Sequence, residues 1–154
     1  MKIMQPNLSQ PYPIQAIDPS AGIFRRLIAM VYDLLVVLGL MFFVGAIATA
    51  FNRMEAVQGP VFQSLIFLVI YGFFAKFWTN GGQTAGMKAW RLRAETPDGR
   101  PITLQQSLVR FLAAFVSAGC FGLGYLWLFF DKDKVTWHEK ISGTRTVIIP
   151  KPEK

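Results

Sequence analysis

Three long apolar stretches restrict the folds open to this chain. Residues 27–51 contain one charged residue, Asp33, and residues 60–78 contain one, Lys76, while residues 111–130 contain none. An α-helix rises about 1.5 Å per residue and the hydrocarbon core of a bilayer is roughly 30 Å thick, so about 20 apolar residues can cross it. Since the stretches lack the polar residues that a soluble helical bundle repeats on a helical period, they predict membrane helices.

The composition agrees with a membrane protein. Only 16% of the 154 residues are charged, whereas soluble domains carry about a quarter. The net charge of +7 comes from Lys and Arg residues that flank the apolar stretches and form no separate basic domain. We therefore expect the bases to contact the lipid bilayer, through its anionic headgroups, and not nucleic acid.

The basic residues also predict an orientation. The loop after the first apolar stretch carries only Arg53, whereas the N-terminal region and the connection after the second stretch are rich in Lys and Arg. By the positive-inside rule, the N-terminus and that second connection are cytoplasmic. We expect a multi-pass protein of the bacterial inner (plasma) membrane, with residues 1–20 as a disordered cytoplasmic tail, residues 21–149 as one membrane domain, and residues 150–154 as a C-terminal tail.

The third apolar segment, residues 104–130, has two interpretations. Thr103 and Gln106 have the spacing of a capping box, which predicts a helix that starts at Thr103. Three glycines then weaken a continuous helix in the middle of the segment: Gly119, Gly122 and Gly124. A straight span would leave six basic residues outside, so we favour a broken helical hairpin with a cytoplasmic C-terminal tail over a straight span.

Two short stretches are typical of β-strands. Residues 90–95 alternate apolar and polar side chains before a Pro-Asp-Gly turn, and residues 144–149 are rich in Thr, Val and Ile. The two can satisfy each other's backbone groups only on the same side of the membrane. The predicted fold is thus an all-α integral membrane protein with two full transmembrane helices (about residues 27–50 and 60–78), a third Gly-broken apolar segment, and a short cytoplasmic strand pair.

An aspartate inside the first span is the most informative single residue. Asp33 lies where a carboxylate costs on the order of 2.5–3.5 kcal/mol to insert. Arg26 precedes it by seven positions, nearly two helical turns, so both side chains project from one face. Either Arg26 meets Asp33 directly, or each meets a partner from another segment. A structural staple is favoured over a proton or cation site.

A second group of ionisable residues follows the last apolar stretch. Asp131, His138 and Glu139 belong to it. One imidazole without a suitable thiol matches no compact zinc motif, so no metal is expected. We expect a carboxylate of this group to fold back onto Arg26 or Arg110.

Several of these pieces together resemble the RDD family, membrane proteins named for one arginine and two aspartates. The resemblance runs from about residue 20 to 149 and rests on these pieces: Phe24-Arg25-Arg26-Leu27 with Asp33, Gly81-Gly82-Gln83-Thr84-Ala85-Gly86-Met87-Lys88, Arg91-Leu92-Arg93, Pro97-Asp98-Gly99-Arg100-Pro101, Leu108-Val109-Arg110-Phe111, and Thr136-Trp137-His138-Glu139-Lys140-Ile141-Ser142-Gly143-Thr144.

The resemblance implies roles for individual residues. The family arginine falls on Arg26, with Arg25 as the alternative, and the first aspartate falls on Asp33. The second aspartate would follow the histidine, where this chain has Glu139; either Glu139 or Asp131 takes that role. A part in transport is proposed for the family.

Two functional hypotheses follow. The first is transport of an ion or small solute through a charge cluster of Arg26, Asp33 and Glu139, with Asp131 and Arg110 as further members, in an oligomer. The second is a non-enzymatic scaffold or assembly factor that binds other membrane proteins. No enzyme activity and no cofactor are expected, because the chain has one histidine and no catalytic triad, phosphate-binding loop or dinucleotide motif.

Overall fold

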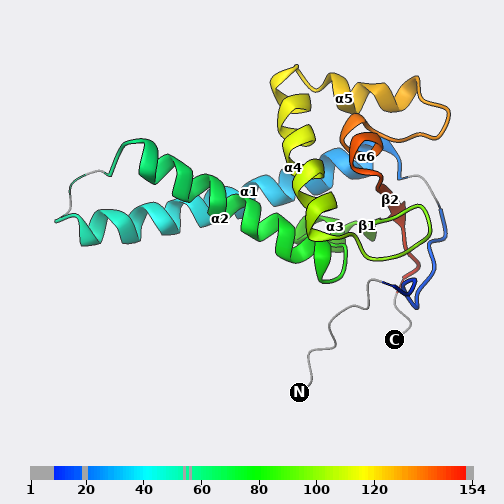
Figure 1. Cartoon of the computed structure of the whole chain (residues 1–154), viewed down its shortest axis with the longest axis horizontal. Coiled ribbons are helices and arrows are strands. Elements are labelled where there is room, and N and C mark those ends of the chain that lie inside the picture. The colour runs from blue at the N-terminus through cyan, green and yellow to red at the C-terminus, as the bar shows by residue number, and fades with distance from the viewer. Residues whose placement is uncertain (1–8, 19–20, 54, 56, 152–154) are drawn as a thin grey trace.

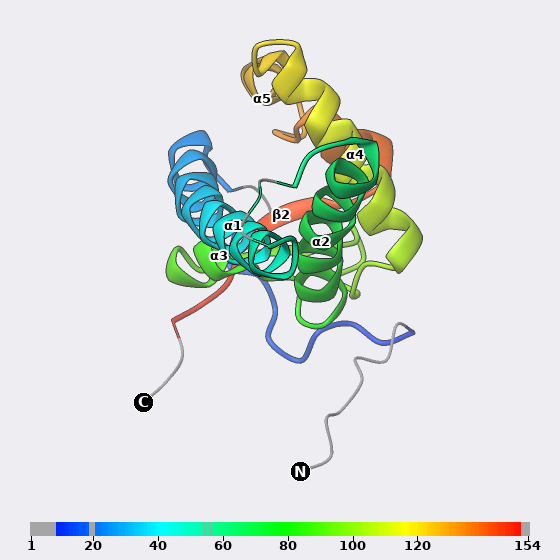
Figure 2. The same cartoon turned by 90° about the vertical axis from the view of Figure 1, so that its left-hand side faces the viewer.

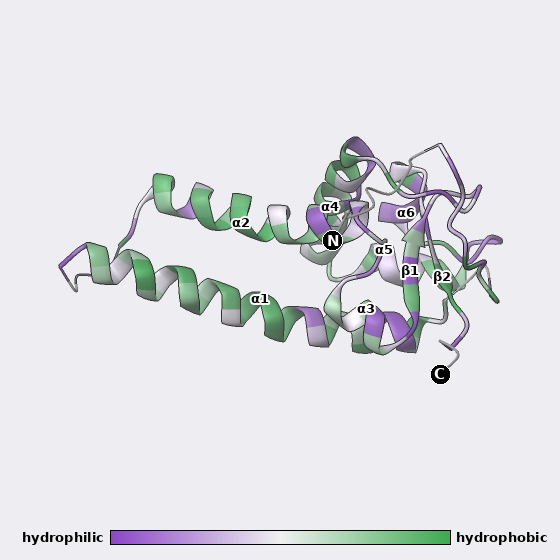
Figure 3. Cartoon of the chain, turned by 90° about the horizontal axis from the view of Figure 1, so that it is seen from below, coloured by the Kyte–Doolittle hydropathy of each residue, from purple (hydrophilic) through white to green (hydrophobic). Residues whose placement is uncertain are grey.

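Two long helices project from a compact end in the computed structural model, which describes residues 9–18, 21–53, 55 and 57–151 (Figure 1). The long helices are α1 (Ile23–Phe51) and α2 (Pro60–Thr79). Both are long and apolar enough to cross a membrane, which confirms the two predicted spans. In Figure 3 most of the ribbon of these two helices is coloured as hydrophobic, whereas the compact end contains more hydrophilic residues.

The compact end is built from short elements between and beyond the spans. Helix α3 (Ala85–Ala89) and strand β1 (Leu92–Glu95) follow α2, and after a turn come α4 (Leu104–Gly119), α5 (Leu123–Leu126) and the 3-10 helix η1 (Trp127–Phe129). Helix α6 (Trp137–Ser142) and strand β2 (Arg145–Ile148) end the fold. Its small apolar core consists of Ala21, Ala29, Trp78, Met87, Leu92, Ala94, Ile102 and Phe111.

The predicted strand pair is confirmed. Strands β1 and β2 form an antiparallel two-stranded sheet in which Leu92 lies opposite Ile148 and Glu95 lies opposite Arg145. Because side chains alternate along a strand, Leu92, Ala94 and Thr146 share one face of this sheet, and Arg93, Glu95 and Arg145 share the other.

The N-terminal segment departs from the expectation of a disordered tail. Tyr12 N–H donates to Gly99 O at 2.9 Å, and Ile17 N–H donates to Ile148 O at 2.8 Å. The Tyr12 ring also lies 4.2 Å from the guanidinium carbon of Arg93. Residues 9–18 thus pack on the sheet because β2 offers an unpaired edge and Arg93 offers a cation to an aromatic ring. Residues 1–8 and 19–20 of the predicted tail, and residues 152–154 of the C-terminal tail, lie outside the described part of the chain.

The third apolar segment is bent and not straight. Helix α4 starts at the predicted capping box, since Thr103 Oγ1 accepts from Gln106 N–H and Gln106 Oε1 accepts from Thr103 N–H. The chain then turns by 104° between α4 and the α5–η1 stretch. Gly122, with a φ of 75°, takes the left-handed conformation at this bend. A straight third span is therefore wrong for this chain.

Helix α4 packs beside α2. The ring of Phe111 lies 5.5 Å from both Phe67 and Tyr71, and the ring of Phe115 lies 6.4 Å from Phe67, between centroids. Figure 2 looks from the loop between α1 and α2 toward the compact end, and it shows α4 next to α2, with α1 on the opposite side of α2. Arg110 of α4 is buried and reaches Thr146 of β2.

Candidate functional site

Arg26 stands at the start of α1, where the helix enters the compact end. Its side chain is 5% exposed. Nη1 donates to Glu139 Oε1 at 2.5 Å, Nε donates to the carbonyl oxygen of Ala21 at 2.8 Å, and Nη2 donates to that of Thr146 at 3.5 Å. Every nitrogen of this guanidinium has an acceptor, so Arg26 joins α1 to α6 and β2.

Glu139 is the acidic centre of the cluster and is fully buried. It lies in the first turn of α6, where its Oε2 accepts from the N–H of the N-cap residue Thr136 at 3.0 Å. Its Oε1 faces both Arg26 and Arg110, the latter at 3.7 Å. Burial alone would raise the pKa of Glu139, but the guanidinium groups of Arg26 and Arg110 outweigh it and lower the pKa to about 2. Glu139 is therefore ionised at neutral pH.

Arg110 reaches the cluster from α4 and is 4% exposed. Nη1 and Nη2 donate to the hydroxyls of Thr144 and Thr146, each at 2.8 Å. The guanidinium carbon lies 5.2 Å from the ring centroid of Trp78 at the end of α2. Arg26, Arg110 and Glu139, called the Arg-Glu-Arg cluster below, thus tie α1, α2, α4, α6 and β2 together.

His138 lines the cluster without adding charge. It is 5% exposed, its ring lies 4.9 Å from that of Tyr125, and Thr136 Oγ1 is within hydrogen-bond distance of the ring nitrogens. Burial, reinforced by the neighbouring Arg110, lowers the pKa of His138 to about 3. The imidazole is neutral at physiological pH.

Asp33 is not bound to Arg26, contrary to the direct pairing considered from the sequence. Its Oδ2 accepts from the hydroxyl of Thr84 at 2.5 Å and its Oδ1 accepts from the backbone N–H of Gly86 at 2.9 Å. Within the described residues no ion pair involves Asp33, which is 7% exposed. The carboxylate fastens α3 to α1 through neutral donors, because a Thr at the N-cap and the free N–H groups of a helix start are natural partners of a carboxylate.

Asp131 also stays apart from the arginines. It pairs with Lys140 at 3.1 Å and accepts from the backbone N–H of Val135 at 3.3 Å, and the hydrogen bond from Lys140 lowers the pKa of this carboxyl. Of the two acids left open as the second acidic residue, Glu139 is the one that contacts Arg26. Arg25 is half-buried and is in no ion pair of the described chain.

A second cluster of buried charges was not found from the sequence. Glu95 accepts from Arg93 through Oε2 at 2.5 and 3.0 Å, and from Arg145 through Oε1 at 2.9 and 3.2 Å. These residues lie on the sheet face that the N-terminal segment covers, where Arg93 also donates to the carbonyl oxygen of Ile14 at 2.8 Å. The signal for this cluster in the sequence is the Arg-x-Arg-x-Glu spacing, because oppositely charged residues two positions apart on a strand share a face.

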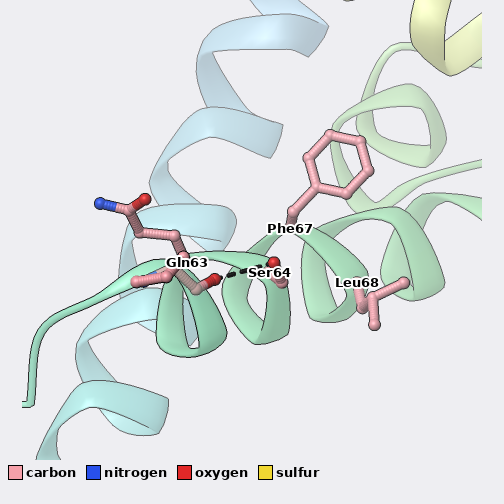
Figure 4. A pocket seen from close by; sticks show the side chains of 5 residues that line it. Gln63, Ser64, Phe67 and Leu68 are labelled. Carbon is pink, nitrogen blue, oxygen red and sulfur yellow. Dashed lines mark hydrogen bonds between the residues drawn. The ribbon is translucent and has the colours of Figure 1, made fainter.

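Two surface pockets lie away from these clusters. One, of about 460 Å³, is lined by Pro60, Gln63, Ser64, Phe67 and Leu68, and in it Ser64 donates to the carbonyl oxygen of Pro60 at 2.8 Å (Figure 4). The other, of about 400 Å³, lies between the far ends of α1 and α2. In the described residues no group of three His, Cys, Asp or Glu side chains could hold a metal ion.

Two apolar membrane helices, fastened at one end by a buried Arg-Glu-Arg cluster and by an aspartate inside the first helix, define an α-helical membrane protein with charges held within its fold. Residues 20–143, most of the chain, match the RDD family, and the protein belongs to that family. No curated protein and no solved structure matches the chain.

Proposed function

We propose that this RDD family protein is a non-enzymatic membrane scaffold that binds other membrane proteins through α1 and α2. The observation that carries the proposal is how the site charges are used. Arg26 and Glu139 are saturated by partners within the chain. Groups bonded in this way stabilise a fold and are poorly suited to exchanging a transported ion.

The two long helices have the surface that such a role needs. Within the apolar 18-residue stretches of the two helices, only 6% of α1 and 11% of α2 is buried inside the protein. Large side chains such as Phe42 and Phe43 of α1 are 79% and 63% exposed. Membrane helices associate by packing and by interhelical hydrogen bonds, so partner helices can replace lipid along this surface.

Cross-linking in intact membranes followed by mass spectrometry tests the scaffold. We expect a stoichiometric partner helix cross-linked near Phe42, and loss of that cross-link in Phe42→Ala at unchanged abundance. The matched control is Phe121→Ala, which removes an even more exposed ring (96%) outside α1 and α2 and should leave the cross-link unchanged. Recovery of the protein without any such partner would contradict the proposal.

A second candidate, transport of an ion or small solute by an oligomer, is favoured by one observation. Asp33 is buried in α1 and is bound only by neutral donors, and a carboxylate in such a setting can bind and release a proton. In proteoliposomes with an internal pH-sensitive dye, transport predicts ion-dependent proton movement that Asp33→Asn abolishes. Absence of movement, or full movement in the variant, would remove this candidate.

We also propose that the compact end lies in the cytoplasm of a bacterium whose inner membrane holds the protein, and that α4 and α5 form a re-entrant hairpin. The basic residues concentrated at that end support the orientation. The hairpin is supported by contacts at both depths. Phe115 of α4 contacts Phe67, which lies about 18 Å along α2 from its end at Thr79. Tyr125 of α5 contacts His138, so the chain has returned to the compact end at that point.

A further inference from the structure

The Arg-Glu-Arg cluster has more positive than negative charge. Arg26 and Arg110 share Glu139, His138 is neutral, and neither arginine has a second carboxylate partner in the part of the chain that the structure describes. A buried net charge of one sign is costly unless a counter-charge is close.

Two buried hydrogen-bond donors beside this cluster have no acceptor. They are Nε of Arg110, a residue 4% exposed, and Nε1 of Trp78, a residue 7% exposed. The two side chains are in contact, with the guanidinium of Arg110 over the Trp78 ring. Leaving such a donor unsatisfied costs about 1–3 kcal/mol, more beside a charge. Both groups donate and neither can accept a hydrogen bond, so the group that would satisfy them must be an acceptor.

From the excess charge and the paired donors we infer an anion-binding site at Arg110 and Trp78, where α2 ends against α4. Its ligand is a compact anionic group with one acceptor atom near both nitrogens: a free ion of the size of chloride or an oxygen of a lipid phosphate. Both sources supply such an acceptor, and a lipid phosphate can reach the site because Arg26 lies where the apolar run of α1 begins, close to the headgroups. The anion would neutralise the cluster and strengthen the contact between α2 and α4.

The site is separate from the proposed scaffold surface. It involves Trp78, a buried residue at the end of α2, whereas the partner-binding surface proposed above is the exposed apolar surface of α1 and α2 and is tested at Phe42. The inference can therefore fail while the scaffold proposal stands, and the reverse also holds.

Thermal unfolding of the purified, delipidated full chain in detergent tests the site. One arm compares sodium chloride with sodium gluconate at equal ionic strength, and the other adds phosphatidylglycerol or phosphatidylcholine in gluconate. The key variant is Trp78→Phe, which keeps the ring under Arg110 and removes only the N–H donor. Trp137→Phe is the matched control, since Trp137 is not in contact with Arg110 in any hydrogen bond or ring contact of the described chain.

A chloride-dependent rise in melting temperature supports a free anion, and a rise with phosphatidylglycerol alone supports a lipid headgroup. In either case the apparent affinity should fall about tenfold in Trp78→Phe, as expected for one hydrogen bond to a charged group, and should not change in Trp137→Phe. The site is refuted if neither arm raises the melting temperature, or if Trp78→Phe keeps the full effect. If Trp78→Phe does not accumulate, Arg110→Lys replaces it, because this change keeps the charge and removes Nε–H. The same loss of apparent affinity is then expected, and a full effect in this variant refutes the site.

Discussion

At the scale of single residues, Glu139 is the group on which both buried arginines depend. It is fully buried, closes the capping box of α6, and supplies the only carboxylate in ion-pair range of Arg26 and Arg110 among the described residues. A buried pair gives little net stability when complete, but removal of one partner leaves an uncompensated charge. Removal of Glu139 would leave two buried guanidinium groups without a carboxylate, so the loss of stability should be large.

Glu139→Gln should therefore destabilise the protein strongly. We expect the free energy of unfolding to fall by about 3–5 kcal/mol, measured by equilibrium unfolding in mixed detergent micelles. The control is Lys140→Gln, which breaks the neighbouring pair with Asp131 at a side chain that is 58% exposed and should cost about 0–1 kcal/mol. Equal effects of the two variants would contradict this account of the cluster.

Asp33 and Thr84 should be energetically coupled. Asp33→Asn removes the charge and Thr84→Val removes the hydroxyl donor, and we expect each to cost about 1–3 kcal/mol. Because both changes affect the same charge-assisted hydrogen bond, the double variant should cost less than the sum, by about 0.5 kcal/mol or more. Thr79→Val, whose hydroxyl bonds to Ala75 in its own helix, should instead be additive with Asp33→Asn. If the stability losses of Asp33→Asn and Thr84→Val were additive, the contact between the two side chains would not be formed.

Acid should destabilise the protein in two stages. His138 titrates near its ordinary pKa of 6.5 when unfolded and at about 3 when folded, so its contribution is complete above pH 6.5 and is lost as the pH falls toward 3. Glu139 contributes fully above its ordinary pKa of 4.5 and loses that contribution as the pH falls toward 2. Melting temperatures from pH 7.5 to pH 4 measure the first stage, which His138→Gln should flatten. A slope unchanged in that variant would contradict the role of His138.

At the scale of elements, the sequence predicted what depends on local pattern. The apolar runs predicted α1 and α2, the Thr103–Gln106 spacing predicted the start of α4, and alternation predicted β1 and β2. What it missed depends on contacts between distant segments. The sequence did not indicate the partner of Asp33, which lies 51 positions away at Thr84. The expectation that a carboxylate after the last apolar stretch folds back onto Arg26 is met by Glu139, 113 positions away, but the sequence left Asp131 open as the alternative.

The contact between α1 and α3 gives a prediction about a single methyl group. A Cβ on Gly86 would overlap the backbone carbonyl of Ala29, so Gly86→Ala must push α3 away from α1 and weaken the hydrogen bond from Gly86 to Asp33. We expect a loss of about 1–3 kcal/mol in stability, as for other overpacked contacts, by the same unfolding measurement. Gly45→Ala, in α1 with no atom near the added methyl, should be neutral or stabilise the helix by up to about 1 kcal/mol. A neutral Gly86→Ala would refute the close approach.

At the scale of the whole molecule, hydrophilic residues are concentrated at the compact end, and the two long helices that project from it are mostly hydrophobic (Figure 3). The N-terminal segment, β1 and β2 meet at the compact end, where Ile17 and Ile148 share a backbone hydrogen bond. Chain segments that bond to each other outside the apolar helices must lie on the same side of the membrane. The sequence left open on which side of the membrane the C-terminal region lies, because the six basic residues after the third apolar segment are only indirect evidence. The 104° bend between α4 and the α5–η1 stretch allows the chain to return to the side from which α4 started.

Side-specific thiol labelling tests this arrangement. In a Cys120→Ser background, Arg100→Cys precedes α4 and Lys132→Cys follows η1, while Arg53→Cys lies in the loop between α1 and α2. A re-entrant α4–α5 hairpin predicts that a membrane-impermeant maleimide reaches positions 100 and 132 from the same side and position 53 from the opposite side. If α4 to η1 instead crossed the bilayer, position 132 would be labelled together with position 53, and β2 could not pair with β1 as the structure shows. The labelling of position 132 therefore decides between a protein that crosses the membrane twice and one that crosses it three times.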